Sequence, residues 1–109
     1  MLGQFEYLLI TAALRLGEDA YGASVWQEVE RTLEHGCSIG ALYTTLDRLE
    51  SKGFVETWTG GATPRRGGRS RRMVRVTEDG VRAAKSFYKT VLRASEDLKW
   101  KPTYVGVRP

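Results

Sequence analysis

The stretch from Ser38 to Val55 reads SIGALYTTLDRLESKGFV and decides the fold. Its first residue, Ser38, can accept a hydrogen bond from the free amides at a helix start, and Gly53 can end the helix in the left-handed conformation. Spacings of three and four residues predict one buried face, made of Ile39, Leu42, Leu46 and Leu49. The opposite face carries short side chains and one arginine, namely Gly40, Ala41, Thr44, Asp47, Arg48 and Ser51. A helix with an apolar back and a slim, hydrogen-bonding front can enter the major groove of DNA.

The length and composition are those of one ordinary globular domain. The chain has 109 residues, which is the usual length of a single domain. Of these, 41% are hydrophobic and 28% charged, a balance typical of soluble globular proteins. It has no apolar run near the ~20 residues of a membrane span, and its first residues do not follow the pattern of a signal peptide. Its one cysteine, Cys37, cannot form an internal disulfide. These features predict a cytoplasmic protein.

Charge is distributed unevenly along the chain. Residues 1–62 hold four basic and nine acidic side chains, a net charge of −5. Residues 63–109 hold 13 basic and four acidic side chains, a net charge of +9. Because the positive excess is segregated, it predicts one surface that meets a polyanion. The helix that starts at Ser38 carries little of this charge, so we expect it to choose a binding site while the later half supplies most of the attraction.

Two helices are predicted before Ser38. Residues 4–16 form a helix that is apolar nearly all round and must be covered on more than one side. A second copy of the chain is one source of this cover, and complete burial within one subunit is the alternative. Residues 21–34 form the second helix, with Glu28 among its water-facing residues and Gly36 as its C-cap. The short turn between this helix and Ser38 predicts a helix-turn-helix unit.

A hairpin and a last helix complete the chain. β-forming residues at 54–58 and 72–76 predict two strands, and a long segment rich in glycine and arginine joins them. Thr77 can cap a helix that runs to about Leu98. We therefore predict a mainly α fold with a small β-hairpin, in which residues 1–76 form a winged helix-turn-helix DNA-binding domain with its wing at about 54–76. A C-terminal dimerisation helix follows at 77–98, and a tail or arm at 99–109.

Four blocks of the sequence resemble one known family. YG at 21–22, GALYTTLDRLE at 40–50, KGFV at 52–55 and TEDG at 77–80 are similar in order and spacing to PadR-type bacterial transcriptional regulators. The resemblance extends over residues 5–90. It implies a dimeric winged-helix protein of the short type, with a single C-terminal helix, that binds operator DNA and usually represses a nearby gene. One departure is Thr44, because the family commonly has proline at this place.

The candidate DNA contacts lie on the third helix and in the wing. Gly40, Ala41 and Thr44 come early in the helix, where recognition helices meet base edges. Thr44 and Thr45 can hydrogen-bond bases or phosphates, and Arg48 can read a guanine. The full set on this helix is Ser38, Gly40, Ala41, Tyr43, Thr44, Thr45, Arg48 and Lys52, of which Ser38, Tyr43 and Lys52 suit phosphates. Since arginine suits narrow minor grooves and phosphate clamps, the wing contributes Arg65, Arg66, Arg69, Arg71 and Arg72.

These assignments have structural alternatives. Tyr43 can simply pack at the helix edge, and Arg48 can pair with Asp47, Glu50 or the acidic residues of the second helix. The wing can be a mobile, solvated loop when DNA is absent. The predicted dimer contacts come from the first helix, the last helix and the tail, and they are Tyr7, Ile10, Leu14, Phe87, Tyr88, Val91, Leu92, Leu98 and Trp100.

Other functions find less support in the sequence. His35 and Cys37 do not make a metal-ligand cluster, so we expect no metal and no cofactor. No P-loop, nucleophile elbow or carboxylate pair indicates an enzyme. A redox-sensing Cys37 would need a lowered pKa and exposure, and an effector pocket could be lined by Trp26, Trp58 and Trp100. The alternatives to double-stranded DNA are a protein partner, which needs no arginine cluster, and structured RNA, whose major groove side chains cannot read.

Overall fold

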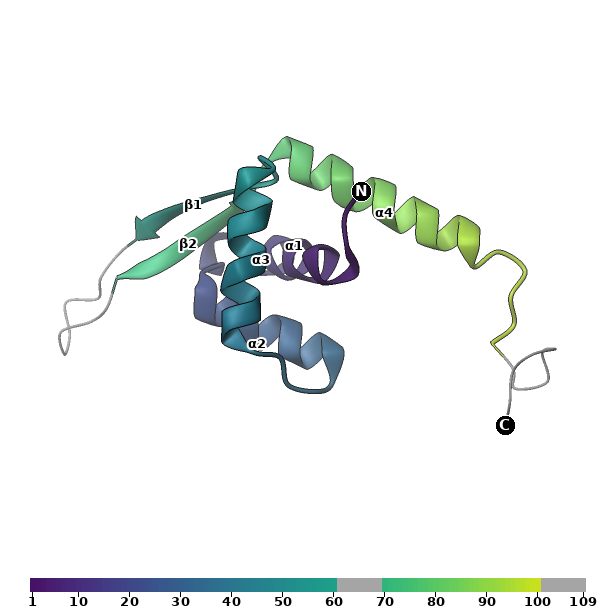
Figure 1. The fold of residues 1–109 in the computed structure, drawn as a ribbon, viewed down its shortest axis with the longest axis horizontal. Helices are drawn as coiled ribbons and strands as arrows, with labels where there is room; N and C mark the ends of the chain where they lie inside the picture. Colours follow the sequence, from purple (N-terminus) through teal and green to yellow (C-terminus); the bar gives the residue numbers. More distant parts are fainter. Residues whose placement is uncertain (61–69, 101–109) are drawn as a thin grey trace.

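The computed structural model describes residues 1–60 and 70–100, which form four α-helices and one β-hairpin (Figure 1). The elements follow the chain in the order α1 (Gln4–Leu16), the short 3-10 helix η1 (Gly17–Asp19), α2 (Gly22–Leu33), α3 (Ile39–Ser51), β1 (Val55–Gly60), β2 (Arg71–Val76) and α4 (Glu78–Ala94). The mainly α winged-helix fold predicted from the sequence is confirmed.

Helix α1 lies at the centre of the helical body. It packs on α2, α3, β2 and α4. Its residues Leu9 and Ile10 are completely buried. The largest fully buried side chains of the core are all aliphatic, namely Leu9, Ile10, Leu42, Leu46, Leu49, Val25, Val29 and Val55. Most of the cover that the apolar α1 requires therefore comes from its own subunit, although Leu14 at its end is 48% exposed.

The two ends of α3 confirm the predicted caps. The Ser38 hydroxyl accepts a hydrogen bond from the amide of Ala41 at 2.9 Å. Gly53 has a φ of +78°, a conformation that side chains resist. Three of the four apolar residues predicted for the back of α3 are buried. The fourth, Ile39, is 46% exposed because it is the first residue of the helix, one turn before the buried part begins.

Two helices end differently from the sequence prediction. Glu34 takes the left-handed conformation that ends α2, with a φ of 61°, so Gly36 is not the C-cap. Helix α4 ends at Ala94 and not near Leu98. Asp97 has a φ of 64°, which turns the chain out of the helical path.

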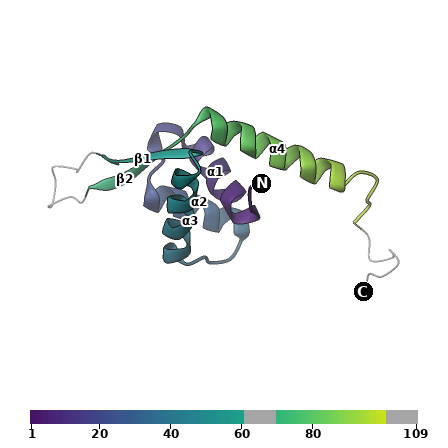
Figure 2. The ribbon, with the colours of Figure 1, turned by 45° about the horizontal axis from the view of Figure 1, so that its top comes forward.

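The antiparallel strands β1 and β2 form a hairpin that is attached to the helical body. The register places Val55 opposite Val76 at the base of the hairpin. The outer edge of β2 bonds to the turn before α2, where the amide of Val74 donates to the carbonyl of Ala20 at 3.0 Å. Figure 2 shows the hairpin and the far end of α4 leaving the body on opposite sides.

Only the first half of α4 packs on the body. Gly80 and Ala84 are buried, and the ring of Phe87 stacks on that of Tyr7 with centroids 4.7 Å apart. A Cβ atom on Gly80 would overlap the carbonyl oxygen of Phe54, so this close approach requires glycine. The far end of the helix extends away from the other elements (Figures 1 and 2).

Candidate nucleic-acid interface

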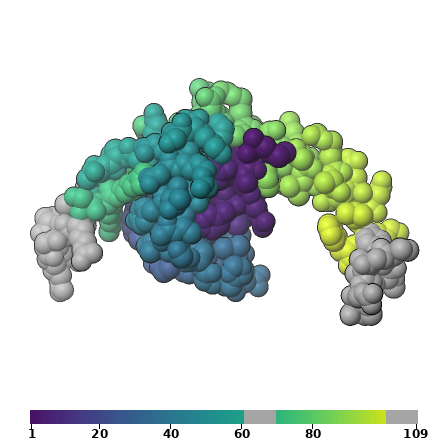
Figure 3. Space-filling view, in the orientation of Figure 1, coloured from purple at the N-terminus to yellow at the C-terminus, as the bar shows by residue number. Residues whose placement is uncertain are grey.

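The open face of α3 carries the candidates for reading bases. In Figure 3 this helix lies at the front of the molecule, between the hairpin and α1. Its exposed residues include Gly40, Ala41, Thr44 and Arg48. Asp47 and Glu50, the expected partners of Arg48 on its own helix, pair with another arginine, and no ion pair of Arg48 occurs within residues 1–60 and 70–100. The face therefore combines short side chains with one long donor that is directed to solvent.

Two residues of α3 are placed for packing. Thr45 is only 6% exposed, which corrects its prediction as a DNA contact, because burial keeps its hydroxyl away from a ligand on the open face. Tyr43 is half-buried, and its hydroxyl occupies the space that a Cβ on Gly22 would need. The alternative in which Tyr43 packs at the helix edge is therefore the one that the structure supports.

Two basic residues expected to contact phosphates are held by acids of the same chain. Lys52 Nζ lies 2.8 Å from Oε2 of Glu6 in α1. A guanidinium nitrogen of Arg72 lies 2.8 Å from Asp47 Oδ1 and 3.2 Å from Glu50 Oε1. Both charges have partners within the chain, and the phosphate contacts through Lys52 and Arg72 stay predictions from the sequence.

Glu6, the partner of Lys52, has a lowered pKa although it is buried. Burial alone would raise the pKa of Glu6. Hydrogen bonds from the amide of Gly3 at 2.8 Å and from Lys52 outweigh this effect and leave the pKa below its usual range. The end of α3 is thus tied to the start of α1 by a charged pair.

Arg71 is the wing arginine at the first residue of β2, opposite Gly60 at the end of the hairpin far from its base. Its guanidinium carbon lies 4.4 Å from the centroid of the Tyr21 ring, a cation–π arrangement that holds its stem near the start of α2. The residue is nevertheless exposed. The other predicted wing contacts, Arg65, Arg66 and Arg69, lie outside the described residues and stay predictions from the sequence.

The dimer candidates line an open apolar surface along α1 and α4. Two shallow hollows there have volumes of about 400 and 290 Å³, and Tyr7 and Tyr88 contribute to both. The candidates with large exposed fractions are Leu14, Tyr88, Val91, Leu92, Leu98 and Trp100. Phe87 and Tyr7 are half-buried against each other. Ile10 is completely buried, which corrects its prediction as a contact, because the packing of its own subunit leaves it no surface to offer.

Comparison with known proteins decides the family. The profile of the transcriptional regulator PadR-like family matches residues 10–86. The chain belongs to this family. As a PadR-like protein it is a DNA-binding transcription regulator, and its family is not one of enzymes. No curated protein matches the sequence.

Solved structures of similar fold agree with the family match. RosR of H. salinarum is 25% identical, with a TM-score of 0.64, and the match covers 90% of this chain and 81% of that one. A PadR family transcriptional regulator from Eggerthella lenta is 21% identical, with a TM-score of 0.65 and coverage of 82% and 75%. A PadR-like transcriptional regulator from Bacillus cereus is 18% identical, with a TM-score of 0.66 and coverage of 84% of both chains.

The single cysteine of the PadR-like chain does not meet the requirements of a redox sensor. Burial and the nearby Glu30 raise the pKa of the Cys37 thiol, against a smaller lowering by Trp26. The indole nitrogen of Trp26 donates to the Cys37 carbonyl at 2.8 Å, which gives this tryptophan a structural role. Trp58 lines a hollow of about 440 Å³ between α1 and the hairpin, and neither of the other two tryptophans reaches it.

Neither a metal centre nor a membrane span is found in the described part of the chain. Within residues 1–60 and 70–100, no group of three or more His, Cys, Asp or Glu side chains is placed to hold a metal ion. Among the same residues, no helix has the length and apolarity to cross a bilayer.

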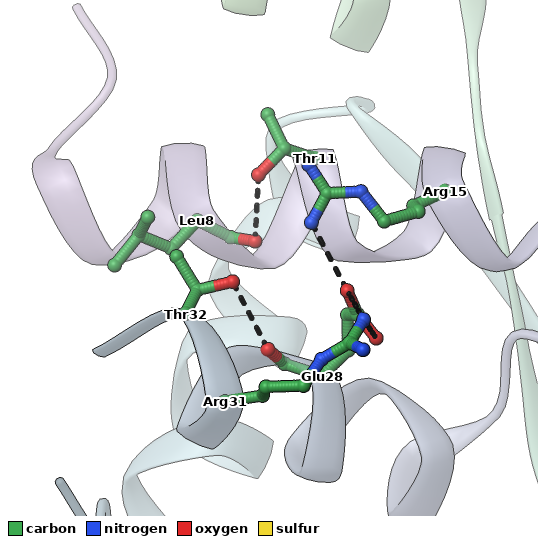
Figure 4. Close-up of polar contacts among 6 residues, drawn as sticks. All are labelled: Leu8, Thr11, Arg15, Glu28, Arg31 and Thr32. Carbon is green, nitrogen blue, oxygen red and sulfur yellow. Dashed lines mark hydrogen bonds and ion pairs between the residues drawn. The ribbon is translucent and has the colours of Figure 1, made fainter. Parts of the chain in front are cut away.

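Sequence reasoning missed a charged cluster that joins α1 to α2 of the PadR-like fold. The sequence pattern predicts that Glu28 faces water, but it is buried between two arginines (Figure 4). Arg31 lies 2.6 Å and Arg15 3.0 Å from its Oε2. The hydrogen bonds from Arg31 and then Arg15 hold the pKa of Glu28 below its usual range. Arg15 was a usable indication, because it is the one basic residue of the largely apolar α1.

Proposed function

We propose that this chain is a homodimeric repressor that reads a palindromic operator with α3 and an arginine-rich wing. The observation that carries the proposal is the open face of α3, where Arg48 is exposed beside small residues. Arg48 would donate two hydrogen bonds to a guanine, and Thr44 would contact a neighbouring base or a thymine methyl. Gly40 and Ala41 would let the helix approach the groove closely, while Ser38 would contact a phosphate.

The wing would supply most of the affinity. Arg71 at the start of β2 is exposed, and Arg65, Arg66 and Arg69 belong to the glycine-rich segment of the sequence just before it. Each phosphate that these arginines neutralise would add about 0.9 to the dependence of log K on log salt. Such contacts position the protein on any DNA and leave the choice of sequence to α3.

A second copy of the chain would cover the apolar surface along α1 and α4. Leu14, Tyr88 and Val91 are 48%, 53% and 44% exposed, which is costly for a monomer in water. Contiguous apolar surface of this kind marks interaction sites. Two α3 helices held about 34 Å apart would enter successive major grooves on one side of the DNA, in the cytoplasm where the chromosome lies.

Selection of DNA fragments from a random pool tests the proposal. At a fixed salt concentration of about 0.15 M, the recovered fragments should share a palindrome whose half-sites are one helical turn apart. The recovered site, placed at the start of a reporter gene, should lower expression when the protein is present. No enrichment over unrelated DNA would contradict the proposal, and an enriched site without two-fold symmetry would contradict its dimeric form.

A further inference from the structure

Two acidic side chains of α3 and one arginine of β2 join the helix to the hairpin, beside the open face of α3. Asp47 and Glu50 lie three residues apart on α3 and therefore on neighbouring positions of one face. Arg72 of β2 reaches across to both, at 2.8 Å from Asp47 Oδ1 and 3.2 Å from Glu50 Oε1. A single guanidinium nitrogen makes both contacts.

The second oxygen of Glu50 binds the other strand. Glu50 Oε2 accepts hydrogen bonds from the Thr57 amide at 3.2 Å and from the Thr57 hydroxyl at 2.5 Å. Thr57 lies on β1 and Arg72 on β2, so one carboxylate of α3 holds both strands of the hairpin. The side chain of Arg72 is 28% exposed, whereas that of Arg75 on the same strand is 67% exposed, which indicates that Arg72 is drawn against α3.

We propose that Glu50 and Arg72 are positioning residues that fix the direction of the wing relative to the reading helix. This inference rests on the proposed function, because it needs a protein that reads DNA with both elements. Arg72 directly follows Arg71 at the start of β2, so the clamp lies at the root of the arginine-rich segment. A rotation of the hairpin would move Arg71 relative to the bases that α3 reads.

The variant Glu50→Gln distinguishes a positioning role of Glu50 from a purely electrostatic one, because the two roles predict different changes in DNA affinity. Replacing Glu50 by Gln removes a negative charge near the DNA-facing surface, and electrostatics alone predicts tighter binding to every DNA. Positioning predicts instead that the ratio of specific to unrelated DNA affinity falls, by about fivefold or more if the coupling has the usual size. The neutral amide cannot form the ion pair with Arg72 and leaves it to Asp47 alone.

The matched control is Glu56→Gln. Glu56 lies on β1, is exposed, and pairs with Arg75 at 3.1 Å, so its replacement removes one charge and one ion pair from the same hairpin. It does not contact α3 through this pair. We expect E56Q to change affinity for the selected site and for unrelated DNA by the same factor, and therefore to leave their ratio unchanged.

Arg72 itself provides the second arm of the test. If its guanidinium stays paired with Asp47 and Glu50 in the complex, R72A should leave the salt dependence of binding to unrelated DNA unchanged. The ratio of the affinity for the selected site to that for unrelated DNA should fall. If Arg72 instead turns to a phosphate in the complex, R72A should lower that salt dependence by about 0.9. Because a single nitrogen of Arg72 makes both contacts, the ammonium of lysine can replace it, and we expect R72K to keep most of the preference for the selected site.

The experiment measures affinities of the full-length chain for a selected site and for unrelated DNA at several salt concentrations, with circular dichroism to confirm that each variant is folded. A reduced ratio in E50Q and R72A that R72K largely retains, together with unchanged salt dependence in R72A, supports the clamp. An unchanged ratio in E50Q, or a reduced salt dependence in R72A, overturns it while leaving the proposed function intact. A wild-type protein without preference for any site overturns both.

Discussion

Gly22 determines how closely α2 approaches α3. The hydroxyl of Tyr43 fills the space beside it, so any side chain at this position would collide with the tyrosine ring. Gly40 on the open face of α3 is different, because a Cβ there would meet the Ser38 hydroxyl oxygen only at an ordinary distance of 3.5 Å. Both glycines lie in the first turn of a helix, but only Gly22 is required by packing.

Alanine at these two positions should have opposite effects on stability. We expect Gly22→Ala to lower the free energy of unfolding by about 1–3 kcal/mol through overpacking. Gly40→Ala should raise it by about 0.5–1 kcal/mol, since alanine loses less backbone entropy in a helix. Urea unfolding followed by circular dichroism measures both values. Equal effects in the two variants would contradict the contact between Tyr43 and Gly22.

The ion pairs of Glu28 should make stability depend on pH. Because its pKa in the folded state lies below the usual value of about 4.3, the ionised form stabilises the fold above that pH, and this contribution is lost as the pH falls through the folded-state pKa. Glu28→Gln should therefore lower the melting temperature at pH 7, with a smaller difference from the wild type near pH 3. Thermal melts at the two pH values give this comparison, and a constant difference would argue against the pairing with Arg15 and Arg31.

At the scale of elements, the wing and α3 divide the work of binding. Helix α3 presents few charges to a ligand, because Asp47 and Glu50 on it and Lys52 at its end are already paired. The segment around Arg65, Arg66 and Arg69 carries a concentrated positive charge in the sequence. We therefore expect the slope of log K against log salt to depend on the wing.

The variant with Arg65, Arg66 and Arg69 all replaced by alanine tests this division. The slope for unrelated DNA should become shallower by about 0.9 for each phosphate that the variant no longer neutralises. Lys99→Ala is a control, because it removes a positive charge from the region after α4. A slope that is unchanged in the triple variant would remove the wing from the binding mechanism.

Local features of the elements could be predicted from the sequence, whereas the pairings between them could not. The caps of α3 and the bounds of α1 depend on nearby residues, whose spacing shows directly in the chain. Lys52 pairs with Glu6, 46 positions away, and Arg72 with Glu50, 22 positions away. Such partners depend on how the elements pack, so spacing along the chain alone could not reveal either pair. Thr45 was misplaced for the same reason, because a threonine suits either face of a helix.

At the scale of the whole molecule, α4 is the element whose apolar side chains are left most exposed by the packing of one subunit. Its first half is anchored by Gly80 and Ala84, but Tyr88, Val91 and Leu92 beyond the stacked Phe87 are exposed. The same surface continues onto α1 through Tyr7 and Leu14, which line the hollow of about 290 Å³ with Tyr88. A second copy packed here would hold the two α3 helices of the dimer at a fixed distance from each other.

A charge placed on this surface should separate the two copies. Val91 is 44% exposed on the apolar side of α4, and Val91→Glu would bury an unpaired carboxylate in the dimer. Sedimentation at micromolar concentration should give a dimer for the wild type and a monomer for this variant. Ser86→Glu adds the same charge at an exposed position away from the apolar stripe, and it should leave the dimer intact. A wild-type monomer would contradict the dimer directly.

The central claim is that α3 chooses the DNA site and that the wing holds it. The most direct measurement compares affinities for a selected site and for unrelated DNA in the wild type, in Arg48→Ala, and in the triple wing variant. Arg48→Ala should weaken binding to the selected site by about tenfold or more, the usual value of one bidentate contact to guanine, with little change for unrelated DNA. The wing variant should weaken binding to both DNAs by similar factors. Equal weakening of both DNAs by Arg48→Ala, or loss of site preference in the wing variant alone, would contradict the account.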